Sequence, residues 1–344
     1  MTPQTSGPED QSPETESAVT SPLWWGVVVA VLAVLGVGYY FLAQAPSPAP
    51  EVHGTPQRVR IGIAMQPTDA LTFVALENGY FHDLGLSVVV KKYPSGKRAL
   101  QEGLFTGDVD LASTADAPVA MAGLDNKEYK ILTTIFFADN VNRVIARRDR
   151  GIETASDLAG KRIATQYASA VHFFLHLFLL DHQLHGAAVE QSFMKAELLP
   201  GALAAGDIDA FSMREPYISR ARELLGDNAV VFAAPGLYAQ VEVLVGTPGF
   251  VDANPEVIEK VLRGLARAET FIHENPGAAM EITSRWLEVS KADIAAIWPT
   301  VSFRMDLGQA LLLLLENEAR WAIDDEISTA KDVPYFLDFI DTKH

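Results

Sequence analysis

From Arg58 onward, short apolar runs of strand length alternate with longer segments in which apolar residues recur at helical spacing. The pattern predicts one set of strands at 59–64, 86–90, 110–112 and 131–137, and a second set at 142–147, 162–165, 189–193, 208–211 and 229–232. A strand at 238–245 is expected to return the chain to the first set. Helices are predicted at 255–273, 277–287, 291–298 and 307–323. This alternation is typical of an α/β fold with two sheets.

Two similar phrases, 99 residues apart, occupy equivalent places in the two sets: 107–118 begins Gly-Asp-Val-Asp, and 206–217 begins Gly-Asp-Ile-Asp. In each, a helical run is predicted to end at the glycine, which tolerates the left-handed conformation that ends helices. A short strand, a polar loop and a new helix follow. Ligands of open parallel sheets bind beyond the carboxyl ends of the strands. The loop residues are therefore predicted to face a ligand, and the aspartates to serve as scaffold.

The N-terminal 57 residues differ from the rest of the chain. Residues 1–22 contain no Lys or Arg and almost nothing to bury, which predicts a disordered tail. Residues 23–43 carry no charge, and 21 helical residues at about 1.5 Å each match a hydrocarbon core of about 30 Å. We therefore predict a transmembrane anchor at 23–43 and a Pro- and Ala-rich linker at 44–57.

A cleaved signal peptide is the alternative for this segment, because Ala43-Gln-Ala45 resembles a small-residue cleavage pattern. The long apolar run, the absence of preceding positive charge and the proline at position 46 favour a retained anchor. Charge alone leaves the orientation of this helix in the membrane open. By the positive-inside rule, Arg58 and Arg60 favour a cytoplasmic location for the C-terminal side, but large domains often override that rule.

Composition excludes several classes of function. The 344 residues allow about two domains, and 49% hydrophobic content indicates a folded protein. A net charge of −17, with no basic stripe, argues against nucleic-acid binding. The chain has no cysteine, which excludes disulfides, thiolate metal sites, cysteine nucleophiles and a lipid-modified cysteine anchor.

A group of short motifs resembles one family of proteins. These are Glu77-Asn-Gly-Tyr-Phe-His-Asp-Leu-Gly-Leu86, the two Gly-Asp-x-Asp phrases, Asp157-Leu-Ala-Gly-Lys-Arg-Ile163 and Glu215-Pro216. Together they are similar to the periplasmic solute-binding proteins of the taurine, sulfonate, nitrate and thiamine-precursor (NMT1/THI5-like) group of ABC importers. The resemblance runs from Arg58 to the C-terminal helices. Two features depart from it: the anchor, and Arg214, which stands where many relatives have tryptophan.

The resemblance implies a two-lobed periplasmic-binding-protein-like fold of type II behind the transmembrane helix. Lobe 1 would comprise 58–140 and 241–344, and lobe 2 would comprise 141–240. The family encloses its ligand between the lobes and delivers it to a permease and its ATPase. The chain is therefore expected to be an extracytoplasmic binding protein on the inner membrane, with the large domain in the periplasm or outside the cell.

Candidate ligand-binding residues follow from the strand ends. Gln66, Pro67 and Thr68 follow the first strand. The Gln66 amide and the Thr68 hydroxyl are each expected to donate a hydrogen bond to a ligand oxygen. The repeat contributes Ser113 and Thr114, and the second lobe contributes Tyr167, Ser169, Ala170 and His172 near a helix start. A helix N-terminus favours an anionic group. Ser169 has the alternative role of capping its own helix, and Tyr167 that of a core aromatic.

The acids at equivalent places in the repeats are Asp116 and Glu215, which we expect a closing cleft to bring toward one ligand. Together with the helix terminus they favour a zwitterion such as an amino sulfonate, or an aminopyrimidine, over nitrate. Two roles stay open for Arg214. It binds an anion, or it forms an exposed ion pair with a nearby acid, which is the commoner role for such a residue.

Four of the eight histidines fall between His172 and His185, but helical spacing puts only His172 and His176 on one face. A third ligand is not apparent, so neither a metal nor a cofactor is expected.

Two other functions stay open beside transport. A membrane-anchored sensor subunit would present the same ligand-bound lobes. Fungal thiamine-precursor enzymes share the implied fold but carry a cysteine-rich motif that this chain lacks, so an enzyme is not expected.

Overall fold

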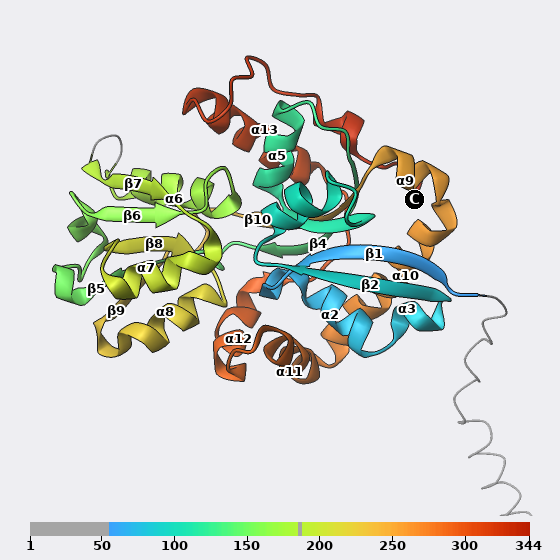
Figure 1. Ribbon diagram of the computed structural model, residues 1–344, viewed down its shortest axis with the longest axis horizontal. Coiled ribbons are helices and arrows are strands. Elements are labelled where there is room, and N and C mark those ends of the chain that lie inside the picture. Colours follow the sequence, from blue (N-terminus) through green and yellow to red (C-terminus); the bar gives the residue numbers. More distant parts are fainter. Residues whose placement is uncertain (1–54, 185–187) are drawn as a thin grey trace, which may run out of the picture. The chain divides into compact units, whose positions relative to one another are not determined.

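Two β-sheets organise the computed structural model, which describes residues 55–184 and 188–344 within one compact unit (Figure 1). The first sheet has the order β11-β4-β10-β3-β1-β2, with bounds Val301–Ser302, Lys130–Ala138, Gln240–Gly246, Leu111–Ala115, Gln57–Ala64 and Leu86–Tyr93. The second has the order β7-β6-β8-β5-β9, with bounds Glu190–Phe193, Arg162–Thr165, Ala210–Met213, Arg143–Arg147 and Ala229–Ala233. The strands predicted from the apolar pattern are confirmed, with small shifts at their ends.

Both sheets mix parallel and antiparallel pairs in the same way. In the first, β1 pairs parallel with β2 and β3, and β10 runs antiparallel to β3 and β4. In the second, β6 pairs parallel with β7 and β8, while β5 is antiparallel to β8 and β9. The strands that follow the repeated phrase, β3 and β8, therefore occupy equivalent positions beside β1 and β6.

Helices cover both faces of each sheet (Figure 1). On one face of the first sheet lie α2 (Ala70–Glu77), α3 (Tyr80–Asp83), α10 (Pro255–Glu274), α11 (Pro276–Leu287) and α12 (Lys291–Ile297), and on the other α5 (Asp116–Leu124) and α13 (Gln309–Asp324). The second sheet packs α6 (Ala170–Asp181) on one face and α7 (Leu199–Ala205) with α8 (Tyr217–Leu225) on the other. Short helices α4 (Gly96–Arg98) and α9 (Pro248–Ala253) lie in connections.

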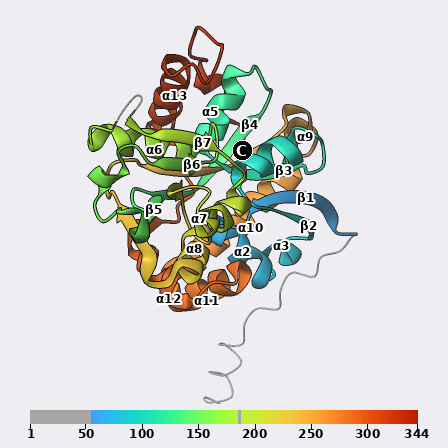
Figure 2. The same cartoon turned by 60° about the vertical axis from the view of Figure 1, so that its left-hand side comes forward.

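Side chains that alternate between the two faces of the first sheet form a separate hydrophobic core on each face. Ile61 and Ile63 are fully buried in the cluster that contains Phe73 of α2, whereas Ala112 and Val243 belong to the cluster of Leu315 on α13. Successive side chains of a strand point to opposite faces, so each inner strand needs apolar residues at nearly every position. Both views place α13 beside α5 (Figures 1 and 2).

The chain passes between the two sheets twice, once between β4 and β5 and once between β9 and β10. The two passages touch, because the Asn142 amide donates to Gln240 Oε1 at 3.0 Å. Both residues are buried. The sheets are thus joined by a pair of adjacent, hydrogen-bonded connections, and the residues beside them lie where the sheets meet.

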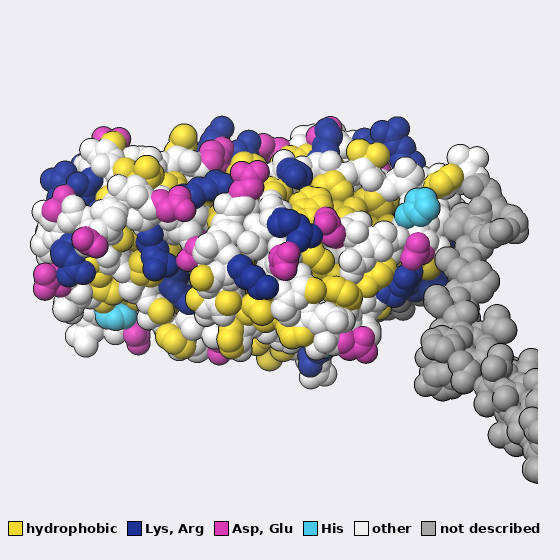
Figure 3. Space-filling model, turned by 90° about the horizontal axis from the view of Figure 1, so that it is seen from below, with side chains coloured by type: hydrophobic (Ala, Val, Ile, Leu, Met, Phe, Trp, Pro, Cys, Tyr) yellow, Lys and Arg dark blue, Asp and Glu magenta, His cyan; other side chains and the backbone are white. Residues whose placement is uncertain are grey.

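The exposed surface carries charges of both signs. On the face shown in Figure 3, Lys and Arg side chains alternate with Asp and Glu and with scattered apolar groups. None of the helices within 55–184 and 188–344 combines the length and the apolar character needed to cross a bilayer. The predicted tail, the predicted anchor at 23–43 and most of the predicted linker lie outside the described residues.

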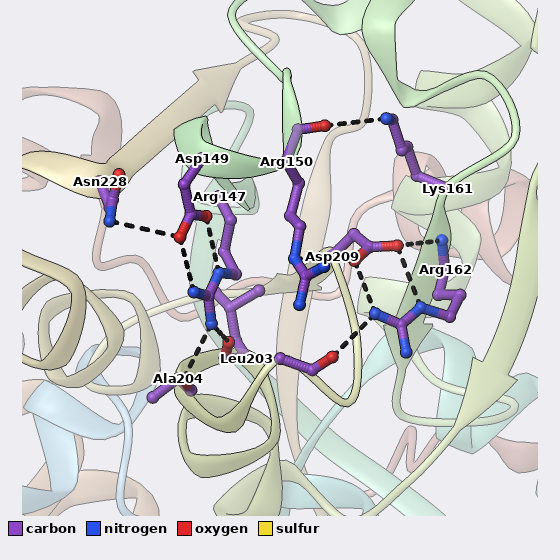
Figure 4. A network of polar contacts seen from close by, with 10 residues as sticks. Arg147, Asp149, Arg150, Lys161, Arg162, Leu203, Ala204, Asp209 and Asn228 are labelled. Atoms are coloured by element: carbon purple, nitrogen blue, oxygen red, sulfur yellow. Dashed lines mark hydrogen bonds and ion pairs between the residues drawn. The ribbon is translucent and has the colours of Figure 1, made fainter.

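The aspartates of the repeated phrase form the same ion-paired clamp twice. Asp110 accepts from the main-chain N–H of Arg60 at 2.7 Å and from its guanidinium, which also donates to the carbonyl of Gly107 at 2.9 Å. Asp209 accepts likewise from Arg162 (Figure 4). Arg162 in turn donates to the carbonyl of Gly206 at 2.8 Å.

Gly107 and Gly206 have φ angles of 75° and 81°, in the left-handed region that glycine adopts without strain. The clamp lowers the pKa of Asp209, first through the hydrogen bond from Arg162. These contacts support the scaffold interpretation of both aspartates.

Candidate ligand-binding site

Buried polar side chains gather where the two sheets meet. Gln66 follows β1 and precedes a 3-10 turn, Pro67–Asp69, while Thr114 is the penultimate residue of β3. Glu242 lies on β10, where it pairs with Ala115 of β3. Arg214 follows β8 of the second sheet. All of these polar residues are less than 5% exposed, which is unusual for charged side chains and requires partners or a ligand.

Several hydrogen bonds cross directly from the second sheet's segments to the first's. Arg214 Nε donates to Gln66 Oε1 at 2.9 Å. The amide of Gln166 donates to Ser95 Oγ at 2.8 Å, and the hydroxyl of Tyr217 donates to the Pro94 carbonyl at 2.7 Å. The loops at the ends of β1 and β2 are therefore held against the loops at the ends of β6 and β8, with the polar side chains between them.

Many atoms at this junction have no partner within the protein. Nine buried side-chain atoms among the described residues lack a hydrogen bond, and six of them are Thr68 Oγ1, Asp69 Oδ1, Thr114 Oγ1, Asn142 Oδ1, Arg214 Nη1 and Glu242 Oε1. Each such atom costs about 1–3 kcal/mol when left unsatisfied. Native proteins keep few of them, so a group of six at one place marks this junction as a candidate site for a polar ligand.

Burial and mutual repulsion govern the charges here. Burial is the largest cause that raises the pKa of Glu242 to about 7, and the nearby Arg214 guanidinium opposes the increase. Burial and the charge of Glu242 raise the pKa of Asp69 well above its usual value. Desolvation favours the neutral form of a carboxyl, and a neighbouring like charge does the same. Strongly perturbed carboxyls in one place are characteristic of functional sites.

Gly96 lets the main chain approach this group closely. A Cβ atom at this position would lie 2.8 Å from Glu242 Oε1 and 2.8 Å from the Thr114 Cα. Contacts this short are not tolerated against backbone, so only glycine fits here without displacing Thr114 or Glu242. The start of α4 therefore packs directly against Thr114 and Glu242, two of the residues that carry unpartnered atoms.

Residues 66–279 match the family model described as NMT1/THI5 like. The chain belongs to the NMT1/THI5-like family. The match covers more than half of the chain and includes the segments that meet at the junction: Gln66–Asp69, Thr114, Arg214 and Glu242.

Curated relatives and solved structures agree with this membership. A protein of Brucella abortus (strain 2308), named as a binding protein, is 24% identical over 240 residues, covering 69% of this chain and 73% of the relative. The taurine-binding periplasmic protein of Escherichia coli (strain K12) is 24% identical over 226 residues, covering 64% and 68%. The alkanesulfonate-binding protein SsuA from Xanthomonas axonopodis pv. citri, solved with MOPS, superposes with a TM-score of 0.71 at 18% identity, covering 84% of this chain and 99% of that one.

The last likeness shows that this NMT1/THI5-like protein has the α/β periplasmic-binding-protein-like fold. The relatives are named as binding proteins, in accord with the expectation that the chain is not an enzyme.

The residues predicted from sequence fall into three groups. Gln66, Thr68, Thr114 and Arg214 meet at the junction. Arg214 is 4% exposed, so the expectation of an exposed ion pair is wrong. The second group, Pro67 and Ser113, lies beside the junction. Pro67 is buried in the 3-10 turn. The Ser113 hydroxyl, on β3, accepts a hydrogen bond of 3.4 Å from the Ala64 N–H of β1.

The two acids of the repeat have protein partners of their own. Asp116 accepts from the Tyr238 hydroxyl at 2.6 Å and from the Val241 N–H at 2.9 Å, and burial raises its pKa to about 6. Glu215 accepts from the Ser219 N–H at 3.0 Å in the first turn of α8. The repeat places both acids at helix starts, but their partners differ: Tyr238 and the Val241 N–H bind Asp116, whereas the α8 main chain binds Glu215.

The third group surrounds a separate cavity of about 670 Å³ between α6, β7 and the residues after α13. Tyr167 and His172 line it, and the Tyr167 hydroxyl donates to the Ile327 carbonyl. His172 Nδ1 accepts from the Ala168 N–H, and burial lowers the pKa of His172 to about 4. Its imidazole is therefore neutral at pH 7.

Ser169 and Ala170 begin α6, which follows this loop. The alternative that Ser169 caps its helix through its side chain is wrong, because its hydroxyl donates instead to the Gln166 carbonyl at 2.6 Å. His176 contacts Asp325 at 2.8 Å. In the described part of the chain, no three His, Asp or Glu side chains are grouped to hold a metal ion.

Sequence reasoning missed Asp69, Asn142, Gln240 and Glu242. A usable signal was present: Gln240 and Glu242 alternate with valines inside the strand predicted at 238–245. A charged residue in such a strand is rarely buried without a functional reason. Asp69 directly follows the predicted Gln66-Pro-Thr68.

Proposed function

We propose that this protein is the extracytoplasmic solute-binding component of an ABC importer and that it binds a small polar organic ligand between two lobes. The observation that carries the proposal is the group of six unpartnered buried atoms where the sheets meet. A ligand that supplies their hydrogen bonds gains affinity from groups that the protein has already desolvated. The direct bond from Arg214 to Gln66 supports closure around the ligand.

The lobes of this proposal are 58–140 with 241–344, and 141–240. The ligand is held by Gln66, Thr68, Thr114 and Arg214, together with Asp69, Asn142 and Glu242. A contact of the ligand with Pro67, Ser113, Asp116, Tyr167, Ser169, Ala170, His172 or Glu215 stays a prediction. The ligand classes proposed from the family are an amino sulfonate such as taurine, another sulfonate, and a thiamine-precursor-like pyrimidine.

A thermal-shift panel on the full-length protein in detergent tests solute binding. The panel contains amino sulfonates, alkanesulfonates, aminopyrimidines, amines and nitrate. A ligand present at 100 times its dissociation constant stabilises the folded state by about 2.7 kcal/mol, which corresponds to roughly 4 °C for a chain of this size. We expect at least one compound to produce such a shift. An unchanged melting temperature with every compound would contradict the proposal.

The delivery step needs a membrane partner, and we propose that residues 23–43 anchor the protein in the inner membrane beside its permease and ATPase. An apolar run of this length supports spanning. Protease added to intact spheroplasts is expected to digest the large domain. Protection of residues 58–344 until the membrane is lysed would show that the domain lies in the cytoplasm and would overturn an extracytoplasmic role.

A further inference from the structure

We infer that the ligand carries a positively charged nitrogen with N–H groups, which binds between Glu242 and Asp69, and a single acceptor group, which binds Arg214. This inference rests on the proposed function and narrows its ligand class. Compounds that are anionic only, such as simple alkanesulfonates, do not fit the site that these residues make.

The six unpartnered atoms at the junction include more hydrogen-bond acceptors than donors. Three of the six accept hydrogen bonds when the two carboxyls are ionised, the state that a bound cation favours: Asp69 Oδ1, Asn142 Oδ1 and Glu242 Oε1. Two are hydroxyl oxygens: that of Thr68 lies beside the Glu242 carboxyl and opposes the increase in its pKa that burial causes, and that of Thr114 donates or accepts as required. Only Arg214 Nη1 is restricted to donating. A complementary ligand therefore presents more donors than acceptors, whereas a sulfonate presents three oxygens and no donor.

The charges favour the same kind of ligand. Asp69, Asp116 and Glu242 are each buried, and the Arg214 guanidinium acts electrostatically on all three. Burial raises the pKa of all three carboxyls, so without a ligand their neutral forms are favoured. When they ionise, one arginine does not balance them, and an anionic ligand would add a further negative charge to a desolvated place. A cationic nitrogen supplies the missing counter-charge and makes charge-assisted hydrogen bonds, which are about twice as strong as neutral ones.

Glu242 is held in position by a chain of side-chain bonds. The amide of Gln240 donates to Glu242 Oε2 at 3.3 Å, and Gln240 Oε1 accepts from Asn142. These contacts leave without partners Glu242 Oε1, on β10, and Asn142 Oδ1, on the first passage between the sheets. A ligand nitrogen that binds Glu242 therefore lies beside the hydrogen-bonded pair of passages that joins the two sheets.

Matched pairs of compounds test the inference by isothermal titration calorimetry on the full-length protein. The pairs are taurine with ethanesulfonate, 3-aminopropanesulfonate with propanesulfonate, and 4-amino-5-aminomethyl-2-methylpyrimidine with its analogue that lacks both amino groups. We expect the nitrogen-bearing member of at least one pair to bind at least tenfold more tightly than its partner. Equal or tighter binding of the partner in every pair that binds would overturn the inference and leave the solute-binding function intact. Binding of no compound would overturn both.

The Glu242→Gln variant assigns the effect to the residue, since it keeps the shape of the side chain and removes its charge. In this variant the affinity ratio between the nitrogen-bearing compound and its matched partner is expected to fall at least tenfold. The control variant Glu256→Gln, at an exposed position, is expected to leave this ratio unchanged. A melting curve of the variant verifies that it is folded. As a second variant, Asp69→Asn is expected to reduce the same preference. A preference that persists in both folded variants would overturn the assignment.

Discussion

Replacement of Arg214 by glutamine is expected to weaken ligand binding about 100-fold or more. The guanidinium is buried, one of its nitrogens binds Gln66 across the junction, and another has no partner. Removal of one member of a buried, charge-assisted hydrogen bond costs about 2–5 kcal/mol, much of it for the group left unpaired. Glutamine retains a donor that reaches toward Gln66, so the loss reports mainly the missing charge and the missing second donor.

Calorimetry on the full-length protein measures this effect, with Arg222→Gln as the matched control. Arg222 lies on α8, is largely exposed and contacts Asp293 at 3.6 Å. Its replacement is expected to leave the affinity unchanged. Arg214→Lys keeps the charge without the planar fork and should lose an intermediate amount. Binding by a folded Arg214→Gln protein within threefold of the parent would exclude Arg214 from the ligand site.

The free energy of unfolding of the ligand-free protein is expected to fall by about 3 kcal/mol, from Glu242 alone, as the pH rises from 4.5 to 8. The pKa of Glu242 is about 7 in the folded protein, against an ordinary value of 4.5. The folded state therefore binds this proton more tightly than the unfolded state. The stability that results is complete below pH 4.5 and is lost as the pH rises through 7.

Urea unfolding of the parent and of Glu242→Gln at several pH values between 4.5 and 8 isolates this contribution. Asp69, Asp116 and Glu318 also have raised pKa values, so both proteins lose stability in the same direction. The parent is expected to lose about 3 kcal/mol more than the variant. Parallel curves would show that Glu242 is not a buried acid. A cationic ligand should reduce the difference, because it stabilises the carboxylate.

Much of the architecture follows from local sequence patterns. Alternating apolar runs predict the strands, and the two Gly-Asp-x-Asp phrases predict equivalent units because a left-handed glycine and a strand-starting aspartate are local requirements. The clamp of Asp110 on Arg60 and that of Asp209 on Arg162 show why the phrase recurs. These features depend on neighbours in one sheet, which sequence spacing places well.

The candidate ligand-binding site is harder to predict from local sequence patterns, because its contacts join segments that are far apart in the chain. Gln66 and Arg214 are 148 positions apart and meet only when the two sheets approach. The repeat predicts equivalent positions for Asp116 and Glu215, yet Tyr238 binds the first and the α8 main chain binds the second. Internal symmetry thus locates helix starts but does not decide which polar groups remain free for a ligand.

A crystal structure of the full-length protein with the panel compound that gives the largest thermal shift would locate the ligand. We expect the ligand to lie between the sheets, bonded to Arg214 and Thr114 and with a nitrogen on Glu242. A ligand bound instead in the cavity lined by Tyr167 and His172, with no contact to Arg214 or Glu242, would contradict this expectation.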